Sequence, residues 1–212
     1  MTDRQKIHAH IDAHLGEHIA KIREFVRMPS VSLELQGLPA CARWTADALT
    51  AIGCKDAAVL DVGDAYPGVF GTLDFGRKKT MLVYGHYDVR PVGHEPWSHD
   101  PFSGELTEYG GFPKVVMGRG SAAKGPLQGF LNAVASTLAV TGTLPVNLVF
   151  LIEGAEILGS PNYAKLVEAR KDAVAKATAL YGPRASQDGA GAVAVTLGYK
   201  GLIFLEMTAS GP

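Results

Sequence analysis

Apolar residues recur at every third or fourth position between residues 4 and 27, which is the first regular pattern in the chain. The series is Ile7, Ile11, Leu15, Ile19, Ile22 and Phe25. This spacing places one apolar stripe along a helix and predicts an amphipathic helix over residues 4–27 that ends at Met28-Pro29-Ser30. On the same segment, His10, His14 and His18 recur at every fourth position and share a face. We interpret that face as solvated and polar, and the alternative is that the three histidines bind a metal ion.

After one more helical stretch, the pattern changes from helical to strand-like. A second helical stretch runs from Pro39 to about Ile52, and Gly53 is suited to end it. Three apolar runs separated by glycine and proline follow and predict strands: Ala57–Val62, Val69–Leu73 and Thr80–Val89. The third run is almost entirely apolar until it turns polar at His86. That pattern is typical of a central strand that is buried on both faces and delivers polar side chains at its carboxyl end.

Strands and helices alternate through the middle of the chain. A loop-rich stretch covers residues 91–113. The elements expected after it are a strand ending near Met117, a helix from about Lys124 to Val140, a strand over Val146–Ile152, a helix from Pro161 to about Leu180, and β-rich runs over Ala192–Leu197 and Leu202–Thr208. This alternation predicts an α/β layered fold with a mostly parallel sheet. Chemistry in such sheets collects at the carboxyl ends of the strands.

Composition and charge narrow the class of protein. Of the 212 residues, 47% are hydrophobic and 19% are charged, which is enough apolar material for a core and excludes intrinsic disorder. The formal net charge of -1 provides no positive field for nucleic acid, so small molecules or proteins are the expected partners. Apolar runs such as residues 148–152 are too short to span a membrane, and the polar N-terminus lacks a signal-peptide core. With two cysteines, Cys41 and Cys54, we expect a reduced, cytoplasmic protein.

Three polar clusters fall at the expected ends of strands: His86 with Asp88, residues 118–125, and Glu153 with Glu156. His86 and Asp88 are two positions apart and share a face of an extended chain. A metal-binding imidazole usually has its second nitrogen held by a carboxylate, a part that Asp88 can play, although such a pair alone is more often structural. Glu153 and Glu156 flank a glycine at a strand exit, a position suited to a general base.

Residues 118–125 read Gly-Arg-Gly-Ser-Ala-Ala-Lys-Gly and lie between an expected strand and an expected helix. They fail the phosphate-binding loop motif, because Ala123 stands before the lysine and Gly125 stands after it. They also fail the dinucleotide fingerprint, since the third glycine is misplaced. No Gly-x-Ser-x-Gly element supports a serine nucleophile. We interpret the segment as a turn leading into a helix, and a phosphate-binding module is the weaker alternative.

The order and combination of short motifs carry more information than any one of them. The chain resembles the dizinc metallopeptidase family of aminoacylases, carnosinase-type dipeptidases, acetylornithine deacetylase and succinyl-diaminopimelate desuccinylase. The matching segments follow the family's order over essentially the whole chain: residues 84–92, 97–102, 118–121, 124–126, 151–154, 159–162 and 197–202. The forms Trp-x-x-x-Pro-Phe and Gly-Arg-Gly-Ser are most similar to the dipeptidase-like branch.

The resemblance implies a fold and a mechanism. It implies a three-layer αβα sandwich with a mostly parallel central sheet, in which residues 1–212 form the N-terminal portion of the catalytic domain. The chain would stop where the family's lid and dimerisation domain begins. By resemblance, two zinc ions activate water to cleave the amide bond of dipeptides or N-acyl amino acids, and the enzyme is a homodimer through its lid. By the same resemblance, His86 is a zinc ligand, Asp88 orients it, and Glu156 is the general base.

Three acidic ligand positions of the family pattern hold other residues here. Ala122-Ala123 stand, one residue short, where the family has an Asp; Ile157 stands where it has a second Glu; and Tyr181 stands where it has an Asp. The nearest later carboxylate is Asp188. A catalytic zinc needs about three protein ligands. We assign His94, His99 and Asp100 to a loop that shapes the substrate entrance, not to the metal. Two hypotheses follow: a dizinc dipeptidase or deacylase, or, as the alternative, a catalytically inactive, metal-poor truncated or engineered scaffold of that family.

Overall fold

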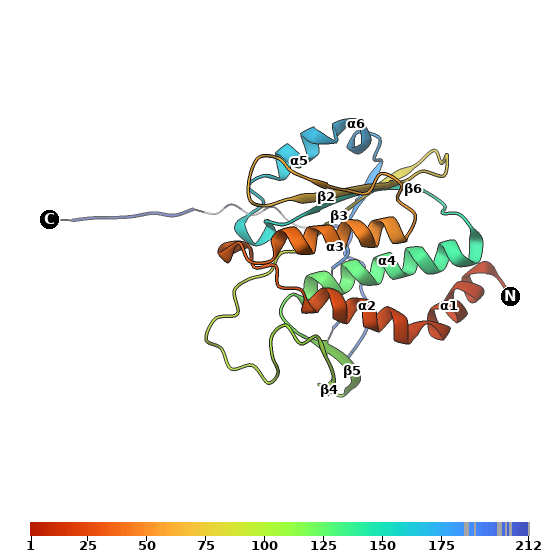
Figure 1. Ribbon diagram of the computed structural model, residues 1–212, viewed down its shortest axis with the longest axis horizontal. Coiled ribbons are helices and arrows are strands. Elements are labelled where there is room, and N and C mark those ends of the chain that lie inside the picture. Colours follow the sequence, from red (N-terminus) through yellow and green to blue (C-terminus); the bar gives the residue numbers. More distant parts are fainter. Residues whose placement is uncertain (185–186, 189, 199–200, 202, 204, 212) are drawn as a thin grey trace.

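The computed structural model describes residues 1–184, 187–188, 190–198, 201, 203 and 205–211. Its centre is a five-stranded sheet in the order β1-β2-β6-β3-β7 (Figure 1). The strands are β1 (Ala58–Leu60), β2 (Gly68–Leu73), β3 (Thr80–His86), β6 (Asn147–Glu153) and β7 (Ala179–Tyr181). β3 is parallel to both β6 and β7, whereas β2 is antiparallel to both β1 and β6. Four strands therefore share one direction, which confirms the mostly parallel sheet.

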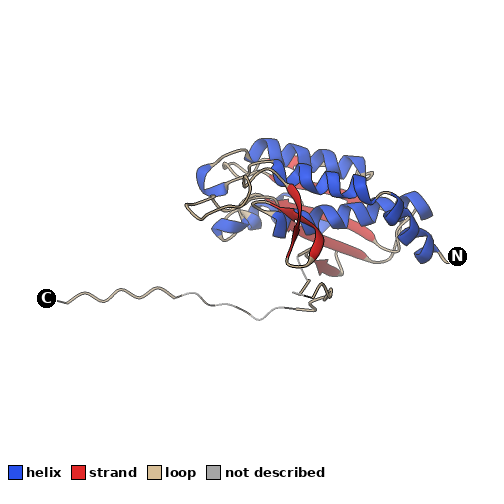
Figure 2. Ribbon diagram, turned by 90° about the horizontal axis from the view of Figure 1, so that it is seen from below, coloured by secondary structure: helices blue, strands red, loops and turns tan. Residues whose placement is uncertain are grey.

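Helices cover both faces of this sheet and complete three layers. α3 (Leu38–Ala51) and α4 (Ser121–Thr141) pack on one face, with α1 (Asp3–Ala13) and α2 (Leu15–Arg27) packed against α4. α5 (Tyr163–Ala169) and α6 (Lys171–Val174) lie on the other face (Figure 1). Figure 2 shows the molecule from below, where the helices overlap the strands of the sheet. The αβα sandwich expected from the sequence is confirmed.

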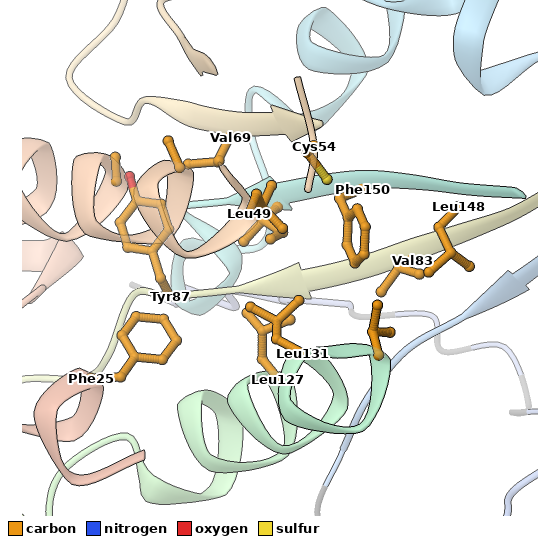
Figure 3. Close-up of a cluster of buried hydrophobic side chains, with 14 of the residues drawn as sticks. Phe25, Leu49, Cys54, Val69, Val83, Tyr87, Leu127, Leu131, Leu148 and Phe150 are labelled. Atoms are coloured by element: carbon orange, nitrogen blue, oxygen red, sulfur yellow. The ribbon is translucent and has the colours of Figure 1, made fainter. Parts of the chain in front are cut away.

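The central strand β6 explains why this sheet needs helices on both sides. Its residues alternate between the two faces, and both faces are buried: Phe150 and Ile152 join the core under α3 and α4, while Val149 and Leu151 join the core under α5. Figure 3 shows the first of these cores, which includes Phe150 of β6 and Leu131 of α4. Alternating apolar side chains on a doubly covered strand produce the unbroken apolar run seen in the sequence.

The N-terminal pattern forms two helices instead of one. His14 leaves the helical conformation, with φ −109° and ψ 14°, and separates α1 from α2. The histidine face is not simply solvated, because α1 and α2 pack on α4. His18 Nε2 lies 3.2 Å from Ser136 Oγ, and the rings of His10 and His14 stack with centroids 4.1 Å apart. The first part of the chain otherwise follows expectation, including α3, which ends before Gly53 at φ +105°.

Three expected segments differ from the structure. The loop-rich stretch 91–113 contains an unexpected strand, β4 (Glu105–Tyr109), which forms a separate two-stranded sheet with β5 (Phe112–Met117), the strand expected to end near Met117. The single helix expected from Pro161 to about Leu180 is replaced by α5 and α6, which are separated at Arg170 (φ −133°, ψ 26°), and by β7, which pairs with β3 at the sheet edge. Of the expected run Ala192–Leu197, the structure gives only a bridge between Val193 and Gln187.

The last expected strand, Leu202–Thr208, lies partly outside the described residues. Its described positions, 203 and 205–208, are not in a strand. Two short 3-10 helices complete the fold: η1 (Ser32–Glu34) and η2 (Glu156–Leu158). Among the described helices, none has the length and hydropathy required to cross a membrane.

Candidate functional site

Two neighbouring strands deliver their polar ends to one edge of the sheet. β3 and β6 are parallel, and their register pairs His86 with Glu153 at the last position of each strand. Because the carboxyl ends of parallel strands meet at the same edge, the residues that follow both strands come together. η2 follows β6 and therefore lies beside the exit of β3. This edge holds the three residues that the sequence singled out: His86, Asp88 and Glu156.

Asp88 fixes the geometry of this cluster. Its side chain is fully buried, and its Oδ1 atom lies 3.1 Å from His86 Nδ1. The same carboxylate accepts the backbone N–H groups of Glu156 (3.1 Å) and Ile157 (3.0 Å). One buried carboxylate therefore orients the imidazole and anchors the first turn of η2. The first of these contacts is the second-nitrogen contact that the His-x-Asp spacing suggested.

His86 stands between two carboxylates. Its Nε2 atom lies 3.6 Å from Glu156 Oε2, on the side of the ring away from Asp88. Burial alone would lower the pKa of His86, but the hydrogen bond to Asp88 and the negative charge of Glu156 outweigh it. The pKa of His86 therefore lies above its usual value. The site favours a positive charge on or beside this imidazole.

Glu156 has a second cationic neighbour that the sequence reasoning missed. Arg184 Nη2 lies 3.4 Å from Glu156 Oε1. The Glu156 side chain is 26% exposed and that of Arg184 is 53% exposed, so the pair lies on the solvent-exposed side of the cluster. Arg184 follows β7, which is the third parallel strand at this edge. No motif marks it in the sequence, and only the position of β7 beside β3 brings it here.

Glu153 is placed differently from Glu156. Its side chain is fully buried, and its Oε1 atom accepts hydrogen bonds from Tyr84 Oη (2.6 Å) and Ser160 Oγ (2.8 Å). Burial raises the pKa of Glu153 despite these two hydrogen bonds. Burial also raises the pKa of the Tyr84 hydroxyl. Of the two glutamates at this strand exit, Glu156 is therefore the one open to a ligand.

The turn at residues 118–125 follows β5 of the separate hairpin, so it does not end a strand of the central sheet as expected. It still lies near the site, because Gly120 (φ +90°) packs closely against Val89, the residue after Asp88. A Cβ added to Gly120 would lie 2.4 Å from Val89 Cγ1. Lys124 points inward from this turn and is completely buried. Its ammonium donates a hydrogen bond to the carbonyl of Met28 at 2.6 Å. Burial lowers the pKa of Lys124.

The loop after β3 is held against the same turn. Arg119 stacks over the ring of Trp97 at 4.8 Å and pairs with the carboxylate of Glu95. His94 and His99 are exposed, and His99 Nδ1 contacts Ser98 Oγ at 3.0 Å. His99 thus contacts a residue of its own loop, and Arg119 joins the loop to the turn at residues 118–125. These contacts do not involve His86. The interpretation of the loop as an entrance stays a prediction.

The donor atoms of the described residues do not fit a pair of zinc ions. The positions that hold acidic ligands in the family pattern carry methyl, aliphatic and phenol groups at Ala122, Ala123, Ile157 and Tyr181. The Tyr181 ring packs against Phe130, with centroids 5.3 Å apart. Asp188 accepts the backbone N–H groups of Ala190 and Ala192 in its own turn. Within the described ranges, no group of three or more His, Cys, Asp or Glu side chains is placed to hold a metal.

Comparison with known proteins places the chain in a family. Residues 82–200 match the sequence model of Peptidase family M20/M25/M40. The chain belongs to this family. Human "Beta-Ala-His dipeptidase" is 33% identical over 186 residues, which cover 79% of this chain and 36% of that protein. A "Cys-Gly metallodipeptidase" of Candida albicans is 33% identical over 166 residues, which cover 70% of this chain and 34% of that protein.

Solved structures of M20 proteins have the same fold. An M20 family metallo-carboxypeptidase of Sulfolobus solfataricus superposes with a TM-score of 0.73 at 30% identity, covering 82% of this chain and 39% of that one. Human carnosine dipeptidase 1 superposes with a TM-score of 0.72 at 30% identity, covering 84% of this chain and 40% of that one. The chain spans little more than a third of the length of the curated M20 relatives named above.

Proposed function

We propose that the edge formed by β3, β6 and β7 corresponds to the dipeptidase centre of the M20 family. In this chain it keeps the residues that would bind and move protons but lacks the acidic metal ligands of the family pattern. The observation that carries the proposal is the arrangement of three side chains: Asp88 holds one nitrogen of His86, and Glu156 faces the other at 3.6 Å. The names of the M20 relatives support dipeptides as the substrate class. N-acyl amino acids are the second class that the resemblance implies.

Each of the three residues has a distinct proposed role. Glu156 is the general base, because its carboxylate is partly exposed and stands in the cluster where an attacking water would be deprotonated. Asp88 is a positioning residue, since it is buried and acts on His86 and on the backbone of η2. His86 is the one imidazole of the cluster and would be the contact for zinc.

The same geometry limits what this chain can do by itself. A catalytic zinc needs about three protein ligands, and a second zinc needs a bridging carboxylate. The described residues offer His86 and Glu156 and lack the acidic side chains at the other matched positions. We therefore propose that the chain binds zinc weakly and hydrolyses dipeptides poorly or not at all.

A peptidase assay on two proteins tests this proposal. The first is the chain itself. The second is a repaired variant with Ile157→Glu, Tyr181→Asp and an Asp inserted between Ala122 and Ala123. With β-Ala-His, Cys-Gly and added zinc, we expect the chain to give no more hydrolysis than zinc alone.

We expect any turnover gained by the repaired variant to fall by about 10²- to 10⁴-fold on Glu156→Gln, since that change removes the proton acceptor. Circular dichroism of each variant controls for folding. Efficient hydrolysis by the unrepaired chain would refute its proposed inactivity. Undiminished turnover after Glu156→Gln would refute the role of Glu156.

A further inference from the structure

Two cationic side chains of the protein stand beside the carboxylates around His86. Asp88 and Glu156 bring two carboxylates to the cluster. Two cations oppose them: Arg184 pairs with Glu156 at 3.4 Å, and the buried ammonium of Lys124 interacts electrostatically with Asp88. In a metal centre, carboxylates of this kind are balanced by the metal ion. Here a side chain of the protein, Arg184, already compensates part of that negative charge.

The fold places Arg184 at this position. Tyr181 pairs with Val83 of β3, so the chain after β7 continues along the edge where His86 and Glu156 meet. Gly182 passes close to β3, because a Cβ added to it would lie 3.8 Å from the carbonyl oxygen of Tyr84. The next residue, Pro183, is buried and fixes the course of the backbone before Arg184.

We propose that Arg184 is the resident cation of this site, ion-paired with Glu156 in the charge-compensating role of a metal ion, and that it thereby weakens the binding of divalent cations at His86 and Glu156. This inference rests on the proposed location of the M20 centre and adds a reason for weak metal binding besides the missing ligands. A guanidinium keeps its charge at all working pH values and presents several N–H donors to a carboxylate.

The size of the effect follows from Coulomb repulsion. A zinc ion bound by His86 and Glu156 would lie about 2 Å from its ligands, and therefore within roughly 5–8 Å of the Arg184 guanidinium. Repulsion between a dication and a single charge about 6 Å apart corresponds to about a tenfold change in Kd, even at the dielectric constant of water. Because Arg184 is 53% exposed, salt screens part of this repulsion. The effect should therefore be largest at low ionic strength.

The test is calorimetric zinc titration at low ionic strength of the whole chain and its variants. We expect Arg184→Ala to bind zinc about tenfold more tightly than the unmodified chain, and Arg184→Lys to stay close to it, because lysine keeps the charge. Lys171→Ala is the matched control, since it removes one exposed positive charge, paired with Glu168, from the segment that returns to the amino end of β3, the opposite end of that strand from His86. We expect that control to leave the Kd unchanged.

A double variant, Arg184→Ala with His86→Ala, locates the gain. Loss of the gain in the double variant supports the proposal, and so does a smaller gain at high salt. A gain that persists without His86 would place the zinc elsewhere, for example on the histidines of α1 and α2, and would overturn the proposal. Equal Kd values for Arg184→Ala and the unmodified chain would also overturn it. Tight, His86-dependent zinc binding by the unmodified chain would instead contradict the proposed function, so the two failures are distinct.

Discussion

Asp88 is the residue whose removal should perturb the site most strongly, and the size of the loss follows from its contacts. It is completely buried and interacts with three groups: His86 Nδ1 and the backbone N–H groups of Glu156 and Ile157. Hydrogen bonds to a charged group contribute about 1.5–3 kcal/mol each, and a buried N–H left without a partner costs about 1–3 kcal/mol. These terms are not additive, because neighbouring groups relax together. We expect Asp88→Ala to lower the free energy of unfolding by about 3–5 kcal/mol.

Urea unfolding followed by circular dichroism measures this loss. Asp88→Asn keeps the side-chain volume and one acceptor oxygen, so we expect it to cost about half as much as Asp88→Ala. Asp47→Ala, on the exposed side of α3, is the control and should change the free energy by less than about 0.5 kcal/mol. A loss below about 1 kcal/mol for Asp88→Ala, with an unchanged m-value, would refute the view that this carboxylate joins the exits of β3 and β6.

Three further predictions concern groups near the site and in the core. Cys41 and Cys54 should react with thiol reagents only as the protein unfolds, because burial raises the pKa of both and brings that of Cys54 to about 12; rapid labelling of the native chain would contradict this. Gly154→Ala should destabilise the fold by about 1–3 kcal/mol in a thermal melt, because its Cβ would lie 2.3 Å from Tyr87 Oη. Burial lowers the pKa of Lys124. At pH values between the folded-state pKa and the ordinary value of 10.5, the unfolded chain therefore keeps this proton more fully than the folded chain does. The unmodified chain should therefore gain stability relative to Lys124→Met as the pH rises through that window, and parallel stability curves would argue against a buried ammonium.

The sequence could predict the sheet and the main site because both depend on short-range patterns. An apolar run such as residues 147–153 has no solvated face, so it requires helices on both sides. Polar residues after two such runs meet when the strands are parallel neighbours, which is why His86 and Glu156 are expected at one edge of the sheet, whereas their roles come from the family resemblance. The spacing of His86 and Asp88 makes Asp88 a candidate partner of the imidazole, and the structure contains that contact.

The features that were missed depend on tertiary pairing. The helix expected over residues 161–180 has good local propensity in its Ala-rich end, but Ala179–Tyr181 gains more from pairing with β3 at the sheet edge. Arg184 reaches Glu156 only because of that pairing. The hairpin of β4 and β5 has no fully buried residue in either strand and carries a register shift between Thr107 and Tyr109. The sequence predicts the strand that ends near Met117, which is β5, but β4 falls within the expected loop.

The central claim is that this M20 chain keeps the proton-handling residues of the site but not the ligands that hold its metal. Calorimetric zinc titration of the chain beside the repaired variant, with Ile157→Glu, Tyr181→Asp and the inserted Asp, tests it most directly. The account predicts weak, substoichiometric binding by the chain and tight binding by the repaired variant that is lost on His86→Ala. Tight, near-stoichiometric binding by the unrepaired chain that disappears on His86→Ala would contradict it.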